Sequence, residues 1–194
     1  MPEYRDRLPQ LDGALFLTDG GIETDLIFNE GLELPLFAAV DLLRTVEGRG
    51  AIERYFRKYL AIASDYGLGF LLETPTWRAS ADWGERLGYE TGLIDQLNAD
   101  AVELLAGIRG DRTAASAPVV ISGCVGPRGD GYDPGVRMSA EEAADYHSAQ
   151  IGVFSRTVAD QVTAITMNYV EEAIGVARAA AWFDMPVVIS FTVE

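Results

Sequence analysis

Residues 69–77 have the sequence GFLLETPTW, in which a strand-like run, Gly69–Glu73, passes at once into a polar turn. Four more apolar runs have this form, and helix-like segments separate them: Ala14–Thr18, Val119–Ser122, Gln161–Thr166 and Pro186–Thr192. Strands that alternate with helices predict a parallel sheet covered by helices. In such folds the chemistry sits at the carboxyl ends of the strands, so the candidate site follows these runs.

The segments between the runs carry helix signals. Apolar spacing predicts helices over Ala51–Tyr66, Ala79–Leu87 and Leu93–Ile108. Ser139, with Glu142 three residues later, has the pattern of a capping box. Asn168 is expected to cap the last helix. Residues 123–132 contain four glycines and one proline and are predicted to form a loop, and residues 113–118 form a small-residue connector.

Bulk composition narrows the class of protein. The formal net charge of −15 argues against a nucleic-acid or anionic-membrane partner, because both need clustered lysine and arginine. The single cysteine, Cys124, cannot form an internal disulfide, which is consistent with a reducing compartment. The amino terminus lacks a signal-peptide pattern, and no apolar stretch approaches the roughly 20 residues of a membrane span. We therefore expect a cytoplasmic protein.

Two architectures bury a parallel sheet on both faces, an open doubly wound sheet and a closed (β/α)8 barrel. The turn after the first run, Asp19–Thr24 (DGGIET), is not a G-x-G-x-x-G pattern, which argues against a dinucleotide site. A whole barrel takes about 250 residues. Five units in 194 residues fit the first five βα units of a TIM-type barrel. We expect one domain over residues 1–194 whose carboxyl-terminal part is missing, because open strand edges need a longer product, an oligomer or a second chain.

Four segments carry a resemblance to a known family. They are Leu17–Leu26 (LTDGGIETDL), Glu73–Ser80 (ETPTWRAS), Ser122–Asp130 (SGCVGPRGD) and Val187–Thr192 (VVISFT). In order and spacing they resemble the amino-terminal part of the homocysteine S-methyltransferase family, of the betaine- or S-methylmethionine-dependent type. The resemblance implies a (β/α)8 homocysteine-binding barrel in methionine biosynthesis. It also implies methyl transfer from a sulfonium or ammonium donor to a thiol such as homocysteine.

The chain departs from this family in two ways. The family binds zinc through three cysteines of later strands, and none of these is in this chain. Cys124 and His147 cannot replace them, because a zinc site needs about four N, S or O ligands. We therefore expect no metal ligand here, although the family implies zinc. Ile165 stands where many members carry a glutamate for the homocysteine amino group, and isoleucine cannot pair with an ammonium.

The resemblance and the residue chemistry together give the candidate substrate-binding residues. Asp19 would accept from the substrate ammonium, and Glu73 would balance the positive charge of the donor. Trp77 would stack on the donor cation by cation–π attraction. The other candidates supply backbone N–H groups, hydroxyls or the shape of the donor side: Gly20, Gly21, Thr74, Thr76, Cys124 and Gly126. Each also has a structural explanation, such as a tight turn or ordinary core packing.

Two other functions stay open at this point. A partial barrel could bind an amino acid or a partner chain without turnover. A metal-free barrel enzyme could instead use Asp19 and Glu73 as acid and base. Nucleophilic catalysis by Cys124 with His147, the only histidine, is not favoured, because His147 belongs to an amphipathic helix.

Overall fold

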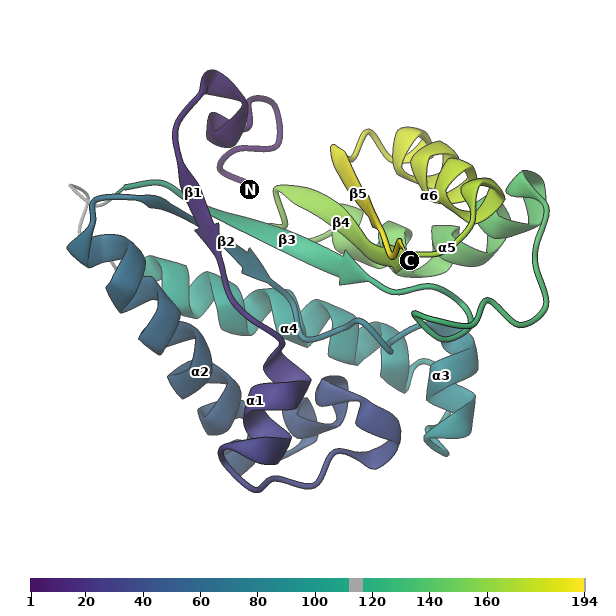
Figure 1. Ribbon diagram of the computed structural model, residues 1–194, viewed down its shortest axis with the longest axis horizontal. Coiled ribbons are helices and arrows are strands. Elements are labelled where there is room, and N and C mark those ends of the chain that lie inside the picture. Colours follow the sequence, from purple (N-terminus) through teal and green to yellow (C-terminus); the bar gives the residue numbers. More distant parts are fainter. Residues whose placement is uncertain (112–116, 194) are drawn as a thin grey trace.

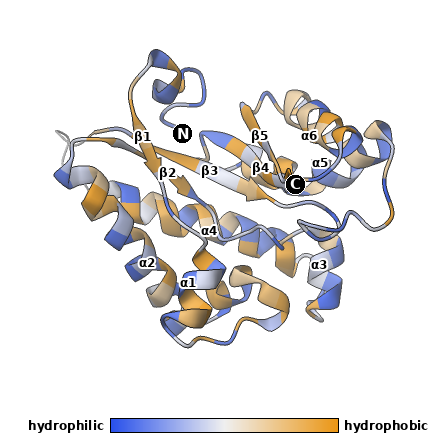
Figure 2. Ribbon diagram, viewed as in Figure 1, coloured by the Kyte–Doolittle hydropathy of each residue, from blue (hydrophilic) through white to orange (hydrophobic). Residues whose placement is uncertain are grey.

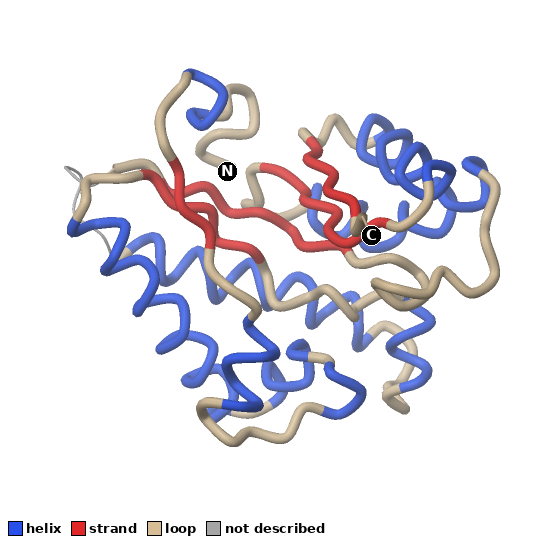
Figure 3. Tube along the Cα trace, in the orientation of Figure 1, coloured by secondary structure: helices blue, strands red, loops and turns tan. Residues whose placement is uncertain are grey.

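The computed structural model describes residues 1–111 and 117–193, so most of the connector predicted over 113–118 lies outside it. Five strands form one sheet: β1 (Phe16–Thr18), β2 (Gly69–Glu73), β3 (Val119–Val125), β4 (Gln161–Met167) and β5 (Val187–Phe191). Their order is β1-β2-β3-β4-β5, and every neighbouring pair is parallel. A doubly wound sheet would reverse its strand order, whereas a barrel wall keeps it. The predicted five-unit portion of a TIM-type barrel is therefore confirmed, as a curled half-barrel (Figure 3).

Helices follow the strands along the chain (Figure 1). The α-helices are α1 (Ile22–Phe28), α2 (Val46–Asp65), α3 (Ala81–Arg86), α4 (Leu93–Gly110), α5 (Ala140–Ser155) and α6 (Val170–Trp182). Three 3-10 helices lie at η1 (Pro9–Asp12), η2 (Pro35–Phe37) and η3 (Ala39–Arg44). Among the described residues, no helix is both long enough and apolar enough to cross a membrane.

Side chains alternate between the two faces of the sheet. One face packs against the helices and contributes buried apolar side chains to the core: Phe70, Leu72, Ile121, Val162 and Ala164. This apolar character is visible along β2 and β3 in Figure 2. The opposite face carries polar side chains, which include Glu73, Ser122 and Thr163. The interior of the half-barrel is therefore polar near the carboxyl ends of its strands.

Two local predictions are wrong. β3 continues to Val125, so Gly123 and Cys124 belong to the strand and not to a loop. A Cβ atom on Gly123 would lie 2.5 Å from the ring of Phe154, so this glycine allows α5 to pack closely on the strand. Asn168 does not cap α6, whose N-cap is Tyr169. Its side-chain amide instead donates to the carbonyl of Asp130 at 2.8 Å.

The predicted capping box of α5 is confirmed. The backbone N–H of Glu142 donates to the Ser139 hydroxyl at 3.2 Å, and the Ser139 N–H donates to the Glu142 carboxylate at 2.8 Å. Two backbone donors of the first turn are thereby satisfied. This cap fixes where the long loop after β3 ends and α5 begins.

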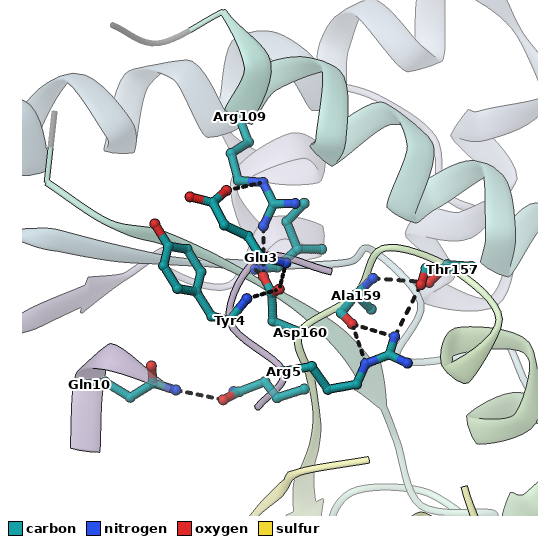
Figure 4. A network of polar contacts seen from close by, with 10 residues as sticks. Glu3, Tyr4, Arg5, Gln10, Arg109, Thr157, Ala159 and Asp160 are labelled. Atoms are coloured by element: carbon teal, nitrogen blue, oxygen red, sulfur yellow. Dashed lines mark hydrogen bonds and ion pairs between the residues drawn. The ribbon is translucent and has the colours of Figure 1, made fainter. Parts of the chain in front are cut away.

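The amino-terminal segment is bound to Asp160 at the amino end of β4 (Figure 4). Asp160, fully buried just before β4, accepts from the backbone N–H groups of Glu3 and Tyr4 at 2.8 Å each. Its second oxygen accepts from Arg109 at 2.7 Å and from the Ile121 N–H at 2.9 Å. One carboxylate thus joins the amino-terminal segment, α4, β3 and β4.

Candidate functional site

A pocket of about 510 Å³ opens where the strands end on the polar side of the sheet. Seven of the predicted residues line it: Asp19, Gly20, Gly21, Glu73, Thr74, Trp77 and Cys124. Thr76 and Gly126 do not line it. The structure thus brings together residues that are more than 100 positions apart in the chain, as expected for the carboxyl ends of parallel strands.

Asp19 follows β1 and is tied to α2. The Tyr55 hydroxyl donates to Asp19 Oδ2 at 2.8 Å. Burial raises the pKa of Asp19 to about 6, and the hydrogen bond from Tyr55 opposes this rise.

The turn after Asp19 is made by two glycines. A Cβ atom on Gly20 would lie 3.0 Å from the Tyr59 hydroxyl. Gly21 is the N-cap of α1, so the two glycines make a close turn that holds Asp19 at the pocket.

Glu73 ends β2 inside the pocket. Its Oε2 atom is buried and has no hydrogen-bond partner among the described residues. Burial raises the pKa of Glu73 to about 8, and the charge of Asp19 raises it further, while the hydroxyls of Thr163 and Ser122 lower it. An empty pocket at neutral pH therefore holds Glu73 mostly in its protonated form.

Glu23 is a third carboxylate in the pocket, and the sequence analysis did not select it. It lies in the first turn of α1 and is only 8% exposed. Burial raises its pKa to about 7; the charge of Asp19 adds to this rise and that of Arg78 opposes it. The signal was present in the sequence, because Glu23 is part of the same DGGIET segment as Asp19. It was missed because it follows the glycine turn and not the strand itself.

Thr74 and Thr76 join β2 to β3. The Thr74 hydroxyl accepts from the Cys124 N–H at 2.8 Å, and the Thr76 hydroxyl donates to the Cys124 carbonyl at 2.7 Å. The two hydroxyls also contact each other at 2.6 Å. These bonds continue the pairing of the two strands beyond Glu73, which fixes the position of that carboxylate.

Trp77 is held in place at the rim of the pocket. Its indole N–H donates to the Thr166 hydroxyl at 2.9 Å. Thr166 has a φ of 58°, an unusual conformation for a β-branched residue and one found where a site stores backbone strain. A Cβ atom on Gly126 would lie 2.3 Å from the Trp77 carbonyl oxygen, so only glycine fits beneath this residue.

Cys124 and His147 do not form a reactive pair. The Cys124 side chain is buried, and burial, with the neighbouring carboxylates, raises the pKa of its thiol well above the usual value. His147 is buried between α5 and α6, where its Nε2 lies 3.0 Å from Glu172 Oε1. Across residues 1–111 and 117–193, no three His, Cys, Asp or Glu side chains form a group that could hold a metal ion. Ile165 lines the pocket as an apolar side chain.

Comparisons with known proteins agree on one family and one fold. A family model described as homocysteine S-methyltransferase matches residues 16–194. The metallated form of the homocysteine methyltransferase MmuM from Escherichia coli superposes with a TM-score of 0.75 at 21% identity, and the match covers 96% of this chain and 66% of that chain. Its oxidised form gives 0.76 at 19% identity, with 96% and 65% covered. The chain thus spans about two thirds of the length of these structures. A comparison with curated proteins found no match.

Proposed function

Because the chain belongs to the homocysteine S-methyltransferase family, we propose that it takes part in methyl transfer from a sulfonium or ammonium donor to the thiol of homocysteine. The observation that carries the proposal is the pocket itself. It opens at the carboxyl ends of the strands, and ten of its nineteen lining residues come from the family-like segments at 17–26 and 73–80. The proposal includes a role in methionine biosynthesis in the cytoplasm.

The predicted residues receive distinct roles in this reaction. Asp19 accepts hydrogen bonds from the substrate ammonium, and the Tyr55 hydroxyl keeps the carboxylate oriented. The backbone N–H groups of Gly20 and Gly21 donate hydrogen bonds to the substrate carboxylate. Trp77, positioned by Thr166, forms an aromatic wall for the donor. These residues bind and orient two small molecules, which lowers the entropic part of the barrier.

Zinc is expected for the family, and when bound it would lower the pKa of the acceptor thiol. The residues described here do not fit a zinc site. Cys124 is the only cysteine of the chain and its thiol is buried, and within residues 1–111 and 117–193 no three His, Cys, Asp or Glu side chains are grouped so that they could hold a metal ion. We therefore assign no step of the reaction to a metal bound by these residues.

The Asp19→Asn variant tests this function. An asparagine keeps the shape of the side chain but removes the charge that holds an ammonium. A hydrogen bond to a charged group contributes about 1.5–3 kcal/mol, so we expect kcat/KM for homocysteine to fall about 10- to 100-fold. Methionine formation from homocysteine, with S-methylmethionine or betaine as donor, is measured by mass spectrometry with and without added zinc. Asp65→Asn, at the exposed end of α2, is the matched control and should keep full activity.

A second function, ligand binding without turnover, is favoured because the described residues line a pocket but do not form a group that could hold a metal ion. Calorimetry distinguishes the two functions. Homocysteine binding that depends on Asp19, with no methionine formed under any metal condition, would select the binding protein. Methionine formation that Asp19→Asn leaves unchanged would contradict the assigned site.

A further inference from the structure

The pocket brings together three carboxyl groups that no cationic side chain of the described residues pairs with. Asp19, Glu23 and Glu73 all line it. Within residues 1–111 and 117–193, none of the three forms an ion pair with lysine, arginine or histidine. One of them, Glu73, also has a buried oxygen without a hydrogen-bond partner. Burial without a partner favours the neutral form of a carboxyl group, and a ligand that brings positive charge would stabilise the ionised forms.

Arg78, the cation whose charge acts on Glu23, already has other partners. The Arg78 guanidinium donates to Asp130 at 2.7 Å and to the Leu36 carbonyl, and it stacks on Trp77 and Trp83 at 4.9 and 4.3 Å. It lowers the pKa of Glu23 from a distance but does not pair with it. Because Arg78 already stacks on Trp77, the cation–π attraction that this ring can offer to a ligand is reduced. The carboxylates are therefore the main source of attraction for a cationic ligand.

We propose that Glu23 and Glu73 form a specificity-determining subsite that selects a net-cationic onium ligand and rejects a zwitterion whose carboxylate lies next to its onium group. The inference rests on the proposed function, because it assigns the subsite to the methyl donor. Two carboxylates beside Asp19 attract an isolated sulfonium or ammonium. They repel a second carboxylate brought to the same place, and in a pocket of reduced dielectric that repulsion is stronger than in water.

Proton release should accompany binding. A cation favours the ionised forms of Glu23 and Glu73, whose pKa values are raised to about 7 and about 8. Affinity for a cation should therefore increase as the pH rises from about 6 to about 8. Groups on every neighbouring element act on the two glutamates: Asp19 after β1, Tyr55 on α2 through Asp19, Arg78 after β2, Ser122 and Cys124 on β3, and Thr163 on β4.

Three matched probes test the subsite by titration calorimetry on the purified protein. Choline is a net cation, glycine betaine carries the same trimethylammonium group with a carboxylate beside it, and 3,3-dimethylbutan-1-ol is the neutral analogue of choline. We expect choline to bind at least about tenfold more tightly than betaine or the neutral alcohol, with proton release visible as a dependence on buffer ionisation enthalpy. Glu23→Gln and Glu73→Gln should each reduce the preference, and the double variant should abolish both it and its pH dependence. Glu85→Gln, an exposed charge on α3, should change neither.

Each result of these titrations supports or contradicts the proposed subsite. Equal or tighter binding of betaine by the wild type, or an unchanged preference in the double variant, would overturn the subsite. Thermal melts establish that the variants are folded, and removing a buried charge should raise their melting temperature above pH 8. A parallel methionine assay separates the two proposals. Charge selectivity without methyl transfer would retain the subsite and contradict the function, whereas methyl transfer without selectivity would contradict the subsite alone.

Discussion

Glu73 shows how a single residue can make stability depend on pH. Its folded-state pKa of about 8 exceeds the usual 4.5, so the folded protein binds a proton that the unfolded chain has already lost. The stabilisation is complete below pH 4.5 and is lost as the pH rises to about 8. We expect the melting temperature of the ligand-free protein to fall across this range, and Glu73→Gln to flatten the decline. Calorimetric melts at one-unit intervals measure it, and an equally steep decline in the variant would contradict the assignment.

Single residues were also where prediction from sequence was least complete. Asp19 and Glu73 could be predicted, because each stands at the end of an apolar run. Glu23 was not selected, although it lies in the same DGGIET segment, because its inward orientation depends on how tightly the Gly20–Gly21 turn leads into α1. Gly123 was assigned to a loop from its composition, but contact with Phe154, which is 31 residues away, keeps it in β3. The positions of Glu23 and Gly123 depend on tertiary packing, which a local sequence pattern does not reveal.

Between elements, α6 packs closely on α5 at Gly175. A Cβ atom on Gly175 would lie 2.4 Å from the Ala143 Cβ, so the two helices touch through backbone and small side chains. We expect Gly175→Ala to reduce the free energy of unfolding by about 1–3 kcal/mol through overpacking. Gly107→Ala in α4 is the control: no atom lies within 4 Å of its added methyl group, and helix propensity alone should stabilise it by about 0.5–1 kcal/mol. Urea denaturation measures both, and a stabilised Gly175→Ala would refute this packing.

The elements themselves could be predicted well. All five strands and the helices after β2 and β3 were expected within a few residues, because strand runs and helix faces have different periods. The barrel-type order could not be derived from those periods alone. It required either a family resemblance or the observed parallel pairing of each strand with the next.

At the scale of the whole molecule, the buried carboxylate of Asp160 connects segments that are far apart in the sequence. It joins the amino-terminal segment to Arg109 and to the backbone before β4. Asp160→Ala would leave Arg109 without its buried partner, and we expect a loss of about 3–5 kcal/mol in the free energy of unfolding. The Asp12→Ala control removes an exposed ion pair with Arg7 and should change it by less than about 1 kcal/mol. Similar denaturation midpoints for the two variants would contradict this role.

The bonds of Glu3 and Tyr4 to Asp160 also set an order of events during synthesis. Glu3 is made 157 residues before the partner that holds it. The amino-terminal segment therefore cannot settle until the fourth strand has left the ribosome, and closing so long a loop carries an entropic cost that local helices do not have. Glu3 and Tyr4 thus become the last residues of this region to be fixed in place, although they are made before the strands.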